Sequence, residues 1–569
     1  MGPASTVSTA RRIAGAAALI AAITIAARMF GFARMVVFYG AVGENQLGQV
    51  YQAANTIPNI IFEIVAGGAL ASLVVPMLAG PIARGSRAEV NQMVSALLTW
   101  SLLILTPAAV LMALSAQPVM SLLSGAASPE MVALGARMLR VFAVQLPLYG
   151  IGIVLAGVLQ AHHRFAWPAL APLLSSVTVI GAYLGFAATA GVGADIGGFS
   201  AGEELLLTGG TTAGVAALSL CLAAPVWRLG VRVAPTLRFA PGAGMQVRSL
   251  AVAGAITISA QQLALLLVVY LTYPPAPEGS MVVYAFAQTI YFLPWAVLVA
   301  PLATSAYPAL AGAAVGGDEP RYRQLLAGSA RGVVLLGFLG AAVLVAVAGP
   351  TAQVIGALAG EERASVSTIA ATIRWFAPGL VGYSLFALLT RALYARGDTA
   401  LAARATVAGW ASVIVADLVL ATLLPVEHRV AALAAGNSFG MVLLGGLLLA
   451  AVRLRAGKEA VAGAVRATLV GFGAAAAAGA LGHGAAWLVG STPRMGPAIA
   501  AGILAGGVVL VSFAGVVLLG DRADAFRLLA RLRGSGPGGS HGSDPGASPG
   551  SGPGRGRPAG RTKEGELAP

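Results

Sequence analysis

The sequence has little charge and few of the residues that carry chemistry. Only 10% of its 569 residues are charged, and it contains 1 cysteine and 5 histidines. A single cysteine excludes an intrachain disulfide and a cysteine cluster around a metal. Neither a Walker-type phosphate loop nor an HExxH zinc motif occurs. The sequence therefore predicts neither an enzyme nor a resident metal or organic cofactor.

What the chain has in excess is apolar sequence, with 58% hydrophobic residues. Soluble domains carry about 25% charged residues, so a chain this poor in charge is predicted to be a polytopic membrane protein. Its apolar runs recur at about 20 residues, the length with which an α-helix crosses the hydrocarbon. The formal charge of +14 would suit a nucleic-acid partner, but the basic residues flank the predicted helix ends. No nucleic acid is therefore expected.

We predict an all-α fold with about fourteen transmembrane helices. The predicted spans are residues 13–41, 47–80, 91–116, 134–160, 165–190, 205–227, 246–273, 281–312, 329–350, 367–394, 400–424, 430–452, 463–490 and 496–520. Arginine-rich loops alternate with loops that are sparse in charge or acidic, and cytoplasmic loops carry the excess of Lys and Arg. Both termini are therefore predicted to be cytoplasmic.

The chain matches itself at an offset of about 233 residues, which indicates a duplicated unit. AITI at 22–25 recurs at 255–258, and RVFAVQLPLY at 140–149 matches RWFAPGLVGY at 374–383. Each unit holds an even number of predicted helices, so the copies should be related by a pseudo-two-fold axis along the membrane normal. Two such lobes would enclose a central cavity.

The repeat divides the chain into four predicted parts. They are an N-terminal six-helix lobe (1–227), a C-terminal six-helix lobe (246–452), two additional transmembrane helices (463–520) and a disordered cytoplasmic tail (534–569). The tail is predicted to be disordered because its Gly, Pro and Ser residues offer almost nothing to bury.

Two arginines, Arg28 and Arg34, lie within the first apolar span. An arginine that faces lipid near the middle of a helix costs about 2.5 to 3.5 kcal/mol, so both side chains are predicted to face inward. Guanidinium groups form forked, charge-assisted bonds with phosphate, which predicts an anionic, phosphorylated cargo. Internal pairing of the arginines with Glu63 is the alternative. Gly31, which lies between them, is a predicted hinge.

The second span carries a stripe of polar residues. At about 100 degrees per residue, the Gln and Asn side chains of this span and its glutamate lie within an arc of about 120 degrees around the helix axis. The residues of this stripe that we predict to contact cargo are Gln49, Gln52, Asn55, Asn59 and Glu63. The alternative is that the amides join neighbouring helices by hydrogen bonds. Pro58 is a second predicted hinge, and Gln288 in the eighth span is predicted to line the opposite wall of the cavity.

Asp417 lies deep in the eleventh span. A carboxylate at this depth predicts a site that couples transport to Na⁺ or H⁺. The alternative is a carboxyl group that bonds to a hydroxyl of a neighbouring helix. The sequence leaves both interpretations open.

The stretch ARMFGFARMVVFYGAVGENQLGQVYQAANTIPNIIFEIVAGGALASLVVPML at 27–78 resembles the amino-terminal signature of the MurJ (MviN) family. These are lipid II flippases of the multidrug/oligosaccharidyl-lipid/polysaccharide exporter superfamily. The resemblance extends to about residue 530 and implies transport of an undecaprenyl-diphosphate-linked peptidoglycan precursor across the bacterial cytoplasmic (inner) membrane. It also implies a cationic central cavity for the headgroup and a groove beside the last two helices for the lipid tail. Arg28 and Arg34 match the family's first-helix arginines, and Pro58 with Asn59 matches its PN motif.

The chain departs from the family pattern at several polar positions. Met35 and Gln49 stand where the family usually has aspartates, Phe62 and Glu63 where it has paired arginines, and Gln288 near the place of another arginine. A divergent actinobacterial paralogue with another cargo is one alternative. A multidrug-type exporter of cationic small molecules and a non-transporting scaffold that recruits cell-wall synthesis proteins are two others. In each case we expect a monomer in contact with membrane lipids.

Overall fold

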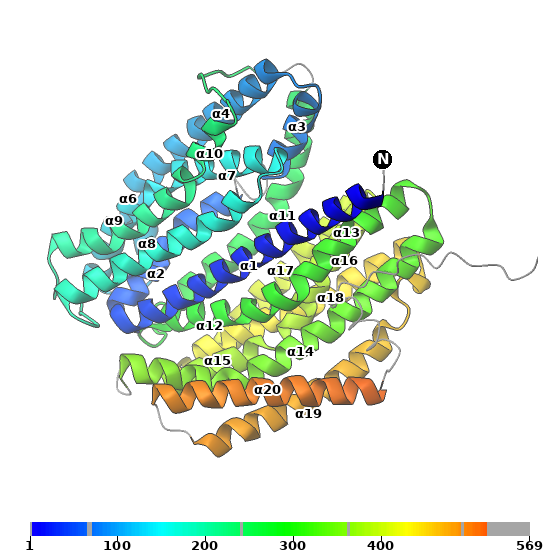
Figure 1. The fold of residues 1–569 in the computed structure, drawn as a ribbon. Helices are drawn as coiled ribbons and strands as arrows, with labels where there is room; N and C mark the ends of the chain where they lie inside the picture. Colours follow the sequence, from blue (N-terminus) through cyan, green and yellow to red (C-terminus); the bar gives the residue numbers. More distant parts are fainter. Residues whose placement is uncertain (1–2, 65–70, 239–242, 361–364, 491–493, 521–569) are drawn as a thin grey trace, which may run out of the picture.

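The computed structural model describes residues 3–64, 71–238, 243–360, 365–490 and 494–520. All regular elements among these residues are helical, which confirms the predicted all-α class. Figure 1 shows two groups of long helices, with α1 running between them and the last two helices on the outside of the second group. We name the groups the N-terminal and the C-terminal bundle.

The N-terminal bundle is held together by close helix contacts. Its helices are α1 (Pro3–Ala41), α2 (Gln46–Phe62), α3 (Ala71–Ala83), α4 (Arg87–Leu114), α5 (Ala116–Ser124), α6 (Pro129–Ala143), α7 (Gln145–Ala161), α8 (Ala166–Ala190), α9 (Ala201–Leu220) and α10 (Ala223–Arg228). Helix α8 packs against α1 and α9, and α7 packs against α3, α4 and α9. Glycine permits this approach, because a Cβ at Gly157 or Gly210 would collide with Val74 or Ala182.

The C-terminal bundle is built in the same way and carries the last two helices. Its elements are α11 (Ala243–Leu271), α12 (Ser280–Pro294), η2 (Trp295–Val299), α13 (Ala300–Val315), α14 (Glu319–Ala359), α15 (Val366–Phe376), α16 (Gly379–Ala395), α17 (Thr399–Leu423), η3 (Val426–His428) and α18 (Arg429–Ala456). A short turn, η4 (Lys458–Val461), leads to α19 (Ala464–Val489) and α20 (Met495–Gly520). Both of these helices pack against α14 and against each other.

The described residues account for most, but not all, of the predicted membrane spans. Among the described residues, 11 segments are long and apolar enough to cross a membrane, or 12 if α15 and α16, bent by 42°, form one span. The predicted count of 14 is therefore not confirmed. The remaining two predicted spans, 47–80 and 246–273, fall on α2 with α3 and on α11. The predicted tail lies outside the described residues, and the predicted domain boundaries stay predictions.

Helices are interrupted at matching places in the two repeats. Helix α6 ends at Ala143 and α7 begins at Gln145, while α15 ends at Phe376 and α16 begins at Gly379. At the second break Pro378 lacks the N–H that would continue the helical hydrogen bonds. A different interruption follows Pro294, where α12 passes into the π-helical turn η2. At the second of the matching breaks, α15 and α16 are bent by 42° relative to each other.

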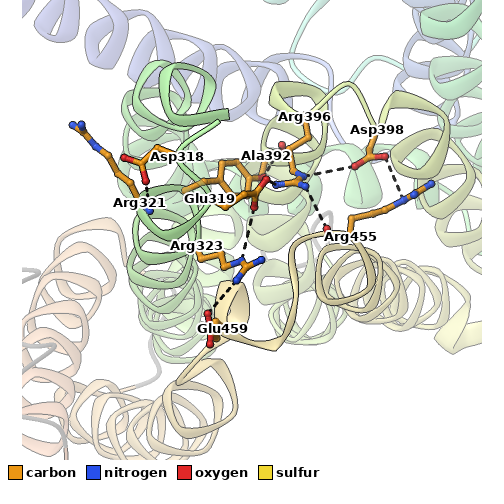
Figure 2. Close-up of polar contacts among 10 residues, drawn as sticks. Asp318, Glu319, Arg321, Arg323, Ala392, Arg396, Asp398, Arg455 and Glu459 are labelled. Carbon is orange, nitrogen blue, oxygen red and sulfur yellow. Dashed lines mark hydrogen bonds and ion pairs between the residues drawn. The ribbon is translucent and has the colours of Figure 1, made fainter. Parts of the chain in front are cut away.

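Charged side chains join the ends of several helices at one end of the C-terminal bundle (Figure 2). Arg396 donates to Glu319 at 2.6 Å, lies 3.9 Å from Asp398, and sits 5.1 Å from the centre of the Tyr322 ring. Asp398 also pairs with Arg455 at 3.3 Å. Arg396 thereby links the start of α14 to the α16–α17 turn and the end of α18.

A second set of charges ties η4 to the same network. Arg323 of α14 pairs with Glu459 of η4 at 3.3 Å and with Glu319 at 3.8 Å. Arg331, about two helical turns further along α14, donates to the carbonyl oxygen of Ala462 at 2.9 Å. These bonds hold the segment that leads into α19 against α14.

We predict that Arg396→Ala lowers the free energy of unfolding by about 1 to 2 kcal/mol, because it leaves Glu319 and Asp398 without a shared partner. The measurement is chemical unfolding of the purified protein in detergent. Arg453→Ala is the matched control, since Arg453 is exposed on the neighbouring helix end. Equal losses in the two variants would contradict the prediction.

Candidate functional site

A cavity of about 700 Å³ lies between the two bundles. Helix α1 lines it with Arg28, Gly31 and Arg34, and the turn after α2 contributes Glu63. Hydroxyl groups on other walls come from Ser175, Ser176 and Thr289. The sequence analysis missed these three residues, although isolated hydroxyls in apolar spans were visible. Two guanidinium groups and one carboxylate thus share one compartment.

The charges of this cavity are not neutralised by one another. Arg28 and Glu63 are exposed and Arg34 is half-buried. Among the described residues, none of these three side chains makes a hydrogen bond or ion pair. The internal pairing considered for Glu63 is therefore not found there. Such groups are available to an incoming ligand.

Three amides of the α2 stripe lie away from the cavity lining. The Gln145 side chain donates to Asn55 Oδ1 at 3.4 Å, and the Tyr149 hydroxyl donates to Asn59 Oδ1 at 2.7 Å. Gln52 is buried. Asn55 and Asn59 therefore join α2 to α7, as the alternative interpretation of the stripe proposed.

Gln49, the first amide of the stripe, connects the two bundles. Its Oε1 accepts from the backbone N–H of Met281 at 2.7 Å, and its Nε2 donates to the carbonyl oxygen of Thr272 at 3.1 Å. The side chain is buried. Gln49 thus contacts the C-terminal bundle rather than the cavity, and we call this set of interbundle bonds the latch.

Two carboxylates extend the latch in reciprocal fashion. Glu44, from the α1–α2 turn, accepts from the Ser365 N–H at 3.2 Å and from the Tyr39 hydroxyl at 3.0 Å. Glu278, from the α11–α12 turn, accepts from the Gln46 N–H at 3.0 Å. Burial raises the pKa of Glu44, and the bonds from Ser365 and Tyr39 oppose that rise. Each bundle therefore supplies a carboxylate that accepts a hydrogen bond from a backbone N–H at the start of a helix in the other bundle, α15 in one case and α2 in the other.

A smaller pocket of about 90 Å³ lies inside the C-terminal bundle and includes Gln288. Gln288 therefore lines this pocket rather than the large cavity. Other polar residues that line the small pocket include Gln261, Tyr383 and Asn437, which the sequence analysis did not single out. Phe292 of α12 lines both spaces, so α12 is the wall between them.

Asp417 lies one helical turn beyond Val413, which lines the small pocket. Its side chain is fully buried, and neither carboxylate oxygen has a hydrogen-bond partner among the described residues. Helix α18 approaches it at Gly436, where a Cβ would collide with the carboxylate. The hydroxyl partner of the alternative interpretation is therefore not found in the described part of the chain.

An apolar groove of about 610 Å³ runs along the outside of the C-terminal bundle. It lies between α14, α16, α18 and α19, with Phe338 and Phe472 in an edge-to-face contact at 6.3 Å. Arg374 is the one charged residue of its lining. The resemblance implied a groove beside the last two helices, and α19 supplies one wall of this groove.

The stretch GNSFG at 436–440 has the spacing of a hydrolase nucleophile motif but lies within α18. Such a motif requires a sharp strand-to-helix turn. Ser438 instead accepts from the Gly379 N–H at 3.1 Å and donates to the Trp375 carbonyl oxygen at 2.6 Å. Its role in this geometry is to hold the break between α15 and α16.

Comparison with known proteins identifies the family. The family model described as "Lipid II flippase MurJ" matches residues 40–509. The chain belongs to the MurJ family. This is a family of transporters rather than of catalytic enzymes, so the chain is a multi-pass membrane protein of a transporter family.

A probable lipid II flippase MurJ of Synechocystis is 25% identical over 407 residues, which cover 68% of this chain and 73% of the relative. The lipid II flippase MurJ of Burkholderia cenocepacia is 25% identical over 383 residues, which cover 67% of this chain and 72% of the relative.

Solved structures show the same fold. A lipid II flippase MurJ in an inward closed conformation superposes with a TM-score of 0.67 at 16% identity, covering 88% of this chain and 98% of that one. An inward-facing multidrug resistance transporter of the MATE family superposes with a TM-score of 0.62 at 15% identity, covering 77% and 98%. At these identities the likeness concerns the fold alone. The fold of this chain is thus shared with that MATE-family transporter.

We predict that Gln49→Leu loosens the latch, because it removes both interbundle bonds of this side chain. Amide hydrogen exchange at the start of α12 should become about fivefold to tenfold faster, the effect of a hydrogen bond of about 1 kcal/mol. Gln52→Leu is the control, since Gln52 is a buried amide on the same helix. Unchanged exchange at Met281 in the Gln49 variant would contradict the role of the latch.

Proposed function

We propose that this MurJ-family protein flips lipid II, an undecaprenyl-diphosphate-linked peptidoglycan precursor, from the inner to the outer leaflet of the cytoplasmic membrane. The observation that carries the proposal is the cavity of about 700 Å³ in which Arg28 and Arg34 face open space. Unpaired guanidinium groups inside a membrane protein are costly unless water or an anionic ligand solvates them. The family model favours this cargo over the cation-exporter and scaffold alternatives.

In this proposal the cargo is held at two places. Arg28 and Arg34 bind the diphosphate through charge-assisted hydrogen bonds. The apolar groove beside α19 takes the lipid tail, because its lining offers almost only hydrocarbon. The headgroup therefore crosses inside the protein while the tail stays in an apolar environment.

In this proposal the latch determines the side of the membrane to which the cavity is open. If both termini are cytoplasmic, as the arginine-rich loops favour, then the α1–α2 and α11–α12 turns lie on the outer side. Glu44, Gln49 and Glu278 would then close the outer side while the cavity admits cargo from the cytoplasmic leaflet. Breaking these bonds and separating the bundles on that side would release the headgroup outside. A single copy of the chain contains all these parts.

Asp417 is the group that we propose to take up a coupling cation, either H⁺ or Na⁺. A buried carboxylate without a partner costs several kcal/mol, and binding of a cation removes that cost. The residue lies on α17, next to the small pocket behind α12. Ion uptake there would favour one packing of the C-terminal bundle over another.

The double variant Arg28→Ala with Arg34→Ala should reduce flipping by about hundredfold or more, because each charge-assisted bond contributes about 1.5 to 3 kcal/mol. The measurements are complementation of a flippase-depleted strain and flipping of lipid II in vesicles that contain the purified protein. Arg404→Ala with Arg453→Ala removes two exposed arginines outside the cavity and should leave activity intact. Failure of the wild type in both assays would refute the proposed cargo.

Asp417→Asn should retain slow, undriven exchange of lipid II but lose its acceleration by an ion gradient, because the amide cannot bind or release the cation. Flipping is measured in vesicles with an imposed H⁺ or Na⁺ gradient, applied one at a time. Asp195→Asn, in an exposed loop, is the control. Gradient-driven flipping that persists in the Asp417 variant would exclude the coupling role.

A further inference from the structure

Glu63 places a negative charge in a cavity that is otherwise cationic. It lies directly after α2 and lines the same space as Arg28 and Arg34. Its side chain is exposed, and no ion pair or hydrogen bond ties it to another described residue. A carboxylate that only stabilised the protein would be expected to pair with one of the two arginines.

The last turn of α2, directly before Glu63, is anchored to α7. The Phe62 ring stacks on the Tyr149 ring at 4.2 Å between centroids. The same tyrosine also contacts Asn59, which lies one turn before Glu63 on α2: the Tyr149 hydroxyl donates to Asn59 Oδ1 at 2.7 Å. Tyr149 thus joins the last turn of α2 to α7, and Glu63 follows this turn at the edge of the cavity.

Charge balance in the loaded cavity then constrains the cargo. A diphosphate bound to Arg28 and Arg34 satisfies the two guanidinium groups but leaves Glu63 desolvated beside an anionic ligand. That arrangement is unfavourable, because like charges repel strongly where water is excluded. A cationic group on the ligand would remove the conflict.

We propose that Glu63 binds a primary ammonium group on the headgroup, so that the preferred cargo is a zwitterionic lipid-linked diphosphate. This inference rests on the proposed function and adds a specificity-determining residue to it. Arg28 and Arg34 select the anionic end of the headgroup, and Glu63 selects the ammonium. A lipid-linked diphosphate without a free amine fits the cavity less well.

The test uses vesicles that contain the full-length protein and two probes, lipid II with a free amine on its peptide and the same lipid with that amine acetylated. The wild type should flip the free-amine probe about tenfold faster, the effect of one charge-assisted bond. Glu63→Gln should flip the two probes at equal rates, and Glu63→Asp should restore part of the preference. Glu427→Gln, which removes an exposed acid, should keep the full preference.

The outcomes separate this inference from the proposed function. Equal flipping of both probes by the wild type overturns the role of Glu63 and leaves lipid II flipping intact. A Glu63→Gln variant that slows both probes by the same factor also overturns it, because the acid would then act on the protein and not on the amine. Flipping of neither probe by the wild type overturns both proposals.

Discussion

The structure depends on the cost of keeping guanidinium groups inside a membrane-spanning helix. Arg28 and Arg34 have no ion-pair or hydrogen-bond partner among the described side chains, and they line a cavity in which water or a ligand would solvate them. That requirement explains why the two bundles do not close fully around α1. It also explains why hydroxyl-bearing residues such as Ser175 and Thr289 line the opposite walls. A cavity that stays polar within the hydrocarbon is what the proposed anionic headgroup would require.

The hydrogen bonds that join the two bundles are ones that bonds to water can replace. Gln49 and Glu278 contact backbone groups of the opposite bundle, and Glu44 does the same at Ser365. Each such bond contributes only about 0.5 to 1.5 kcal/mol net, because water replaces the lost partner when the bundles separate. In the proposed mechanism a latch of this kind would close one side of the cavity without making its opening prohibitive, and cargo binding would shift the balance between the closed and open states.

The sequence was sufficient for the helical class, for the family and for the placement of Arg28 and Arg34, because hydrophobicity and buried charge are local properties. It was not sufficient for the amide stripe. Helical periodicity shows which residues share a face but not what lies opposite that face. Asn59 meets Tyr149 of its own bundle, whereas Gln49 meets Met281 of the other one. Contacts over such separations arise only from tertiary packing, and Gln288 entered the smaller pocket for the same reason.

Helix α12 is where the two internal spaces meet, and its construction suits a movable wall. Phe292 borders both the large cavity and the small pocket. Directly beyond it, Pro294 and the π-helical turn η2 interrupt the regular hydrogen bonds, so this end of α12 can change direction at lower cost than an unbroken helix. Repacking around Asp417 on one side of the wall would therefore reach the headgroup on the other side by moving one element. In the proposed mechanism α12 would therefore connect cation uptake at Asp417 to release of the headgroup from the large cavity.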